Sequence, residues 1–210
     1  MEKVALIEDI RNIIENTFEI LRGQCTNDAS RLVFPDYSSG QKRVSEQELR
    51  FVFVEQLQSF LEINKYYYSV ETPTTDSYTF SQNRKNVPCK SGEGQSANFD
   101  LTIKDEHGIN IAIIEFKANS ASRHQYAKDL IKLWNEKEKG QYRFFVCLFN
   151  LMTEKTRDAL RNKLLSTECY GSKLESSIDI QVIAQSLQAQ QKKAYYDKII
   201  YVENNVIKER

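Results

Sequence analysis

The sequence of 210 residues has little glycine and proline and no long apolar run. Seven glycines and three prolines are too few for a collagen-like or low-complexity chain. Without an apolar run approaching the length of a transmembrane helix, no membrane span is expected. The N-terminus carries acidic residues and lacks the apolar block and small-residue cleavage site of a signal peptide. The sequence therefore predicts a cytoplasmic globular protein of one domain that makes no membrane contact.

The chain also lacks an excess of charge and a metal-binding cysteine pattern. Its 29 basic and 29 acidic residues balance, which excludes a uniformly basic, histone-like DNA-binding protein but leaves a local basic cleft possible. The four cysteines are widely separated, with no C-x-x-C pair and no histidine at zinc-ligand spacing. Free thiols in a reducing compartment are therefore expected.

Hydrophobic periodicity predicts an α/β fold with a mixed central β-sheet flanked by helices. Helices are expected over about 3–21, from 45 onward, and over 122–139, 153–165 and 185–195. Strands are expected at 66–71, 99–104, 109–117, 142–149, 178–184 and 199–202. Pro73 is expected to stop the first strand, and the polar residues 76–98 to form an irregular loop.

Two charged residues stand near the end of an otherwise apolar predicted strand. Residues 111–114 are all apolar, whereas Glu115 and Lys117 follow on either side of Phe116. A buried charge must be paired or bound to a metal, because its desolvation alone costs too much free energy. The apolar neighbours indicate depth, so both charged side chains are expected to have partners.

The preceding predicted strand places a third charge beside these two. If Lys104 pairs with Ile109 across a type I turn over 105–108, Asp100 lies opposite Ile113. Glu115 is then its diagonal neighbour, and Lys117 shares that face because strand side chains alternate. This prediction depends on the register, since a slip of one residue would move Asp100 to the other face.

These residue types suit the hydrolysis of a phosphodiester. Two carboxylates a diagonal step apart offer hard oxygen ligands to Mg²⁺ or Mn²⁺. A neighbouring lysine helps to orient a water molecule and offsets negative charge on a phosphate. The competing interpretation is a salt bridge at the exposed end of a strand, which would add only about 0–1 kcal/mol of stability.

Asp100, fourteen intervening residues and Glu115-Phe116-Lys117 resemble the signature of the PD-(D/E)xK nuclease superfamily, which has the restriction-endonuclease-like fold. The order of predicted elements over residues 45–150 is similar as well. The resemblance implies that Asp100 and Glu115 are metal ligands, that the Phe116 carbonyl is a further ligand and that Lys117 is the catalytic lysine. Residues 1–40 would form an N-terminal helical extension, and 151–210 would add C-terminal helices and short strands.

Many members of the superfamily also use a glutamate from the helix before the hairpin. Glu48 is the first candidate, because Ser45-x-x-Glu48 opens the helix in a similar way, and Glu55 is the second. The same Ser45 and Glu48 also fit a capping box, so a structural role for Glu48 stays open. Basic residues near the motif are expected either to contact phosphates or to be solvated: Lys42, Arg43, Arg84, Lys85, Lys90 and Arg123.

The sequence thus predicts a Mg²⁺- or Mn²⁺-dependent nuclease that acts on nucleic acid, with DNA as the expected substrate. Asp100, Glu115, Lys117 and Glu48 are its expected catalytic residues, and no residue is identified as a specific nucleic-acid contact. The rival hypothesis is a catalytically inactive nucleic-acid-binding or protein-interaction module on the same fold. A homodimer is considered because nucleases that resemble this chain often dimerise to cut two strands.

Overall fold

A computed structural model of the protein describes residues 2–26, 34–40, 43–82, 85–171, 174–188 and 195–210. The helices in this part of the chain are α1 (Glu2–Thr26), α2 (Glu46–Asn64), α3 (Arg123–Trp134) and α4 (Glu154–Leu164). The strands are β1 (Tyr67–Gln82), β2 (Lys85–Ser91), β3 (Gln95–Lys104), β4 (Asn110–Ala118), β5 (Tyr142–Phe149), β6 (Ile180–Ser186), β7 (Tyr196–Glu203) and β8 (Val206–Glu209).

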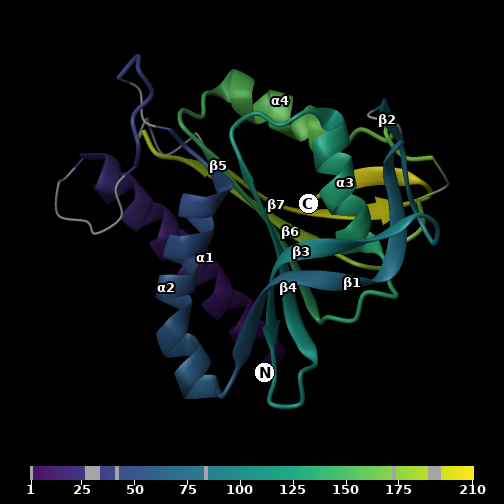
Figure 1. Ribbon diagram of the computed structural model, residues 1–210, viewed down its shortest axis with the longest axis horizontal. Coiled ribbons are helices and arrows are strands. Elements are labelled where there is room, and N and C mark those ends of the chain that lie inside the picture. Colours follow the sequence, from purple (N-terminus) through teal and green to yellow (C-terminus); the bar gives the residue numbers. More distant parts are fainter. Residues whose placement is uncertain (1, 27–33, 41–42, 83–84, 172–173, 189–194) are drawn as a thin grey trace.

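These elements form an α/β protein with an eight-stranded mixed open sheet (Figure 1). The strand order is β2-β1-β3-β4-β5-β6-β7-β8. Strands β4, β5 and β6 are parallel neighbours, whereas the strands on either side of this group pair antiparallel. The mixed central sheet that the sequence predicts is therefore confirmed.

Strand β5 shows why helices cover both faces of the sheet. All eight of its residues are buried. Phe144 and Val146 belong to the hydrophobic cluster that includes α1 and α2, and Phe145 and Cys147 to the cluster that includes α3 and α4. Figure 1 shows α1 and α2 together on one side and α3 and α4 on the other. A strand that is apolar on both faces requires cover on both faces.

The first helix forms part of the main core. Ile10, Ile14, Phe18 and Leu21 are fully buried and lie about one helical turn apart. They pack in the same cluster as α2 and the central strands, so the segment expected as an extension contributes to the core. Within the described chain, neither α1 nor another helix is long and apolar enough to cross a membrane.

The prediction of an irregular loop over residues 76–98 is wrong. Strand β1 continues through Pro73 to Gln82 and forms a hairpin with β2. Pro73 is tolerated because it lies beyond the end of β2, where one edge of β1 has no strand partner. The helix expected over 185–195 is also wrong where it can be compared, because Gln185 and Ser186 belong to β6. Residues 189–194 lie outside the described part.

The β3–β4 hairpin has the expected turn but not the expected register. Gly108 donates its amide to the Asp105 carbonyl at 3.0 Å, as the predicted turn requires. Ile109 is paired with Asp105 and not, as expected, with Lys104: the Asp105 amide donates to the Ile109 carbonyl at 3.0 Å. This moves the pairing by one residue. Ile111 is then an extra residue in β4, since Lys104 pairs with Asn110 but Ile103 pairs with Ala112. The two displacements together shift the pairing by two residues.

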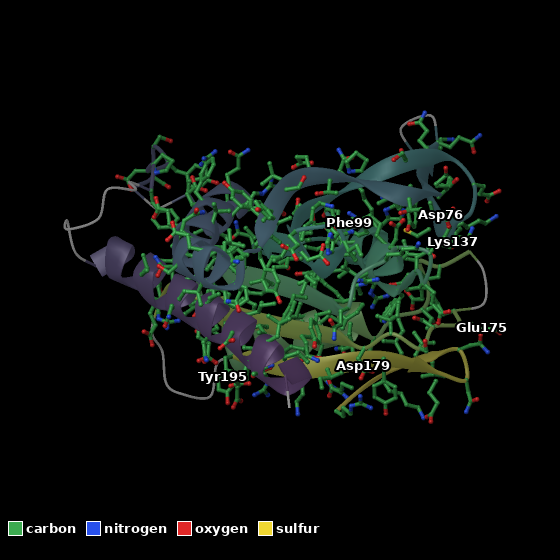
Figure 2. The ribbon with its side chains drawn as sticks, turned by 90° about the horizontal axis from the view of Figure 1, so that it is seen from below. Asp76, Phe99, Lys137, Glu175, Asp179 and Tyr195 are labelled. Carbon is green, nitrogen blue, oxygen red and sulfur yellow. The ribbon has the colours of Figure 1, made fainter. Side chains whose placement is uncertain are left out.

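A buried carboxylate joins the end of α3 to an irregular part of β1. The helix expected to reach residue 139 ends at Trp134, and Glu138 turns back toward the sheet. Its carboxylate accepts hydrogen bonds from the amides of Thr75 and Asp76 at 2.8 and 2.9 Å and from the Tyr78 hydroxyl at 2.8 Å. Asp76 and Lys137 lie side by side at the same place (Figure 2).

The contacts of Glu138 predict a specific loss of stability. Glu138→Gln keeps the volume of the side chain but removes the charge and replaces one acceptor atom with a donor. Hydrogen bonds to charged groups are each worth about 1.5–3 kcal/mol, so we expect the free energy of unfolding to fall by about 2 kcal/mol. Urea denaturation measures this, with Glu62→Gln on the exposed surface of α2 as the matched control. An equally small change in both variants would contradict the structural role of Glu138.

Candidate active site

An open cavity of about 670 Å³ brings together the three residues of the hairpin motif. Asp100 of β3 and Glu115 and Lys117 of β4 all line it. The other walls come from the first turn of α2, from β1 and from α3. The prediction that these three side chains share one place in the fold is therefore confirmed, although it started from a different register.

The change of register keeps the charges on one face because it amounts to two residues. Leu101 pairs with Ile114, so Asp100 comes opposite Glu115 and not opposite Ile113 as expected. Strand side chains alternate with a period of two, so a shift of two residues restores the original face. The two carboxylates are consequently direct cross-strand neighbours instead of diagonal ones.

Both oxygens of Asp100 accept hydrogen bonds. Its Oδ2 accepts the backbone amide of Phe116 at 2.8 Å, and its Oδ1 accepts Arg50 Nη2 at 2.9 Å. The other end of the Arg50 guanidinium donates to Glu71 at 2.7 Å. Arg50 therefore connects α2 to both β1 and β3, and it holds the Asp100 carboxylate in a fixed orientation.

Glu115 is almost completely buried and has a buried lysine as its partner. Glu115 and Lys132 are each 2% exposed, and Lys132 Nζ lies 2.5 Å from Glu115 Oε1. The same ammonium group lies 3.3 Å from Asp129 and donates to the Asn98 carbonyl at 2.8 Å. Burial raises the pKa of Glu115 well above its ordinary value; Lys132 opposes this effect, whereas the charge of Asp129 adds to it.

Lys117 is held in its charged form by two carboxylates. Its Nζ lies 2.7 Å from Asp129 and 3.4 Å from Glu46. Burial alone would lower the pKa of Lys117, but Asp129 and Glu46 together raise it above the ordinary value. A lysine in this state suits the binding of a phosphate or the orientation of water, because it carries no free lone pair with which to act as a base.

Glu46, and not Glu48, is the glutamate of α2 that reaches the cavity. Glu48 is buried away from it and bonds Arg43 at 3.0 Å. Residues two apart on a helix are separated by about 200°, so Glu46 and Glu48 face opposite sides. The expected capping box does not form either, since the Ser45 side chain makes no capping hydrogen bond. Glu55 is exposed and does not line the cavity.

Sequence reasoning missed several charged residues of the site, among them Glu46, Arg50, Asp129 and Lys132. Their spacing carried a usable signal, because Glu46 and Arg50 are four apart on α2, and Asp129 and Lys132 are three apart on α3. Residues at these separations share a helix face. Which of the two faces meets the sheet depends on packing, and the charged residues alone do not determine it.

Of the basic residues singled out near the motif, those that the structure describes do not line the cavity. Lys42 and Arg84 lie outside the described residues, and Arg43, Lys90 and Arg123 pair with acidic side chains. Lys85 is exposed on β2. Lysine side chains do reach the cavity, but they come from β4 and α3: Lys117, Lys128 and Lys132.

The site has suitable donors for a divalent cation, although cations of the chain already bind them. Carboxylates and basic groups alternate as Glu71–Arg50–Asp100 and as Glu115–Lys132–Asp129–Lys117–Glu46. These two sets hold five acids against three bases; Lys128, a further base of the cavity, offsets part of this excess, and a divalent cation would offset the rest. In the described part of the chain, no three His, Cys, Asp or Glu side chains are arranged to hold a metal ion. A metal at Asp100 and Glu115 would therefore compete with Arg50 and Lys132 for these carboxylates.

Comparison of the chain with protein-family models, with curated proteins and with solved structures gives no match. Membership of a family is therefore not established by similarity. The resemblance to PD-(D/E)xK nucleases depends on Asp100, on Glu115-Phe116-Lys117 and on the order of the surrounding elements.

The pairing of Glu115 with Lys132 predicts a large effect on stability. Lys132→Met leaves a buried carboxylate without its cation, and we expect the free energy of unfolding to fall by about 3 kcal/mol near neutral pH. Lys155→Met, at an exposed position of α4, is the control. The double variant Lys132→Met, Glu115→Gln should recover part of the loss, and a strictly additive effect in urea denaturation would contradict the pairing.

The loss of stability in Lys132→Met should depend on pH. Because the pKa of Glu115 is raised in the folded chain, the folded state binds more protons than the unfolded state, and stability falls as pH rises toward the folded pKa. Removal of Lys132 raises that pKa further. The deficit of Lys132→Met relative to the unchanged protein should therefore be larger at about pH 8 than at about pH 5.

Proposed function

We propose that the protein is a metal-dependent nuclease that hydrolyses phosphodiester bonds in nucleic acid, with DNA as the first substrate to test. The proposed fold type is restriction-endonuclease-like. The observation that carries this proposal is the convergence of Asp100, Glu115 and Lys117 on one open cavity. A network of ion pairs that served stability alone would have no need of a cavity at its centre.

The residues proposed to hold the metal are Asp100 and Glu115, together with the Phe116 carbonyl that the motif implies. A bound Mg²⁺ or Mn²⁺ supplies a Lewis acid for the phosphate and lowers the pKa of a coordinated water. Lys117 orients the attacking water and offsets the charge that develops on the phosphate. Asp129 and Glu46 are positioning residues, because they fix the ammonium group of Lys117.

Nuclease activity is tested with purified protein on single- and double-stranded DNA and RNA in Mg²⁺ or Mn²⁺. We expect Asp100→Asn and Lys117→Met to lose about 10²–10⁴-fold in rate, the typical contribution of a positioned catalytic group. The thermal midpoint of each variant reports whether it is folded. The proposal is wrong if no substrate is cut, or if both variants cut as fast as the unchanged protein.

The two glutamates of α2 give a matched comparison within the same assay. Glu46→Gln weakens the hold on Lys117, so we expect a lower rate of cleavage with little change in stability. Glu48→Gln changes a side chain outside the cavity, and its rate should stay close to that of the unchanged protein. A larger effect of Glu48→Gln than of Glu46→Gln on the rate would favour Glu48, the residue expected from the sequence.

Metal binding has a readout that does not depend on activity. A ligand that binds only the folded state stabilises it, by about 2.7 kcal/mol at a concentration one hundred times its Kd. We therefore expect Mg²⁺ or Mn²⁺ to raise the thermal midpoint of the protein, and to leave that of Asp100→Asn, Glu115→Gln unchanged. An equal rise in both proteins would place the metal elsewhere.

One observation favours the rival, a catalytically inactive binding module. The side chains of Asp100, Glu115 and Lys117 all lie in ion pairs with residues of the same chain. In a protein that had lost the catalytic activity but kept the fold, we would expect the charged side chains of the site to be bound in ion pairs in this way. The rival predicts binding of nucleic acid that needs no metal and that survives Glu115→Gln.

A further inference from the structure

The cavity extends beyond the charged residues along the end of β1 and the start of β3. The walls here carry mainly small or neutral polar residues: Thr79, Ser81, Gln82, Gln95, Ser96 and Asn98. Phe80 is the large apolar side chain in this part that is not buried. The proposed hydrolysis uses none of these residues, so this half of the cavity needs another explanation.

Phe80 and Lys128 both line this half of the cavity and contact each other. Lys128 Nζ lies 5.3 Å from the centre of the Phe80 ring. Tyr78 stacks on Phe80, with ring centres 5.6 Å apart and planes 11° apart, and it anchors the hairpin through Glu138. Phe80 is thus an aromatic ring that Tyr78 supports and over which the ammonium group of Lys128 lies.

Lys128 differs from the other two lysines of the cavity. Lys117 and Lys132 are committed to carboxylates, whereas Lys128 is exposed and forms no ion pair with the described residues. Its ammonium group is therefore available to a phosphate at low cost. The acids around Asp100 repel a phosphate chain, so a cation of the cavity that contacts an aromatic ring and no carboxylate of the described residues would help to bring the chain in.

We propose that Phe80 and Lys128 form a binding subsite for one nucleotide of a single-stranded nucleic acid. A base stacks on the Phe80 ring while the adjoining phosphate binds Lys128 and draws its ammonium group off the ring. A base within a duplex is already stacked on both faces, so only an unpaired base can use the ring. This inference rests on the proposed function, because it names the form of the substrate of the same cavity.

The test measures binding of labelled single-stranded and duplex DNA by fluorescence anisotropy. Ca²⁺ replaces Mg²⁺, and gels check that the DNA stays intact. Phe80→Leu removes the ring but keeps an apolar side chain, and we expect it to bind the single strand about tenfold more weakly with little change for the duplex. Phe80→Trp keeps an aromatic ring and should bind the single strand about as tightly as the unchanged protein does. Phe51→Leu, an exposed phenylalanine outside the cavity, is the control.

Lys128→Gln tests the phosphate contact separately. For a single strand, each phosphate contact adds about 0.7 to the slope of log affinity against log salt concentration, so the slope should become shallower by about this amount. Lys155→Gln, on the exposed surface of α4, should leave the slope unchanged. Thermal midpoints confirm that each variant is folded.

The outcomes separate this inference from the proposed function. If the protein cuts DNA but Phe80→Leu and Lys128→Gln bind the single strand as well as it does, the subsite is wrong and the nuclease proposal stands. An equal loss for single strand and duplex also overturns the subsite, because stacking on Phe80 requires an unpaired base. If the protein neither binds nor cuts nucleic acid, both proposals are wrong.

Discussion

The burial of the Glu115 carboxyl group is the constraint on which the rest of the site depends. It lies in β4 between Ile114 and Phe116, both fully buried, and is itself 2% exposed. Such a group is tolerated only with a partner, because loss of its hydration costs several kcal/mol. Lys132 provides that partner from α3. The helix that satisfies this requirement also forms a wall of the cavity, so the packing of α3 and the shape of the site are coupled.

The same cations that stabilise the folded chain compete with the metal of the proposed reaction. Arg50 and Lys132 occupy oxygens of Asp100 and Glu115. The free energy of metal binding is therefore the gain from coordination minus the cost of weakening these two ion pairs. The local excess of acid reduces that cost, since a divalent cation relieves repulsion that three bases leave uncompensated. Zero net charge over the whole chain says nothing about this local imbalance.

The predictable parts of the fold are those whose signal lies within one element. The apolar run of β5 and the periodic stripe of α2 indicate burial without reference to a partner, and both elements form as expected. The strands within residues 76–98 were missed because their residues are mostly polar, and they are stabilised by pairing with each other and by Glu138. Asp129 and Lys132 were missed because their role also depends on a partner elsewhere in the chain: Glu115, which lies on β4.

The hairpin shows why part of a site can be predicted when the register cannot. The exact partner of Asp100 depends on where the turn closes and on whether a bulge such as the one at Ile111 intervenes, and local sequence determines neither. The face of the sheet on which the Asp100 side chain lies depends only on whether the total shift of the register is odd or even. Here the turn closes one residue away from the expected position and the bulge at Ile111 adds a second residue. The total shift is even, so Asp100, Glu115 and Lys117 still meet at one cavity. Loss of the bulge alone would turn Asp100 to the opposite face, which makes Ile111 as important to the site as the charged residues themselves.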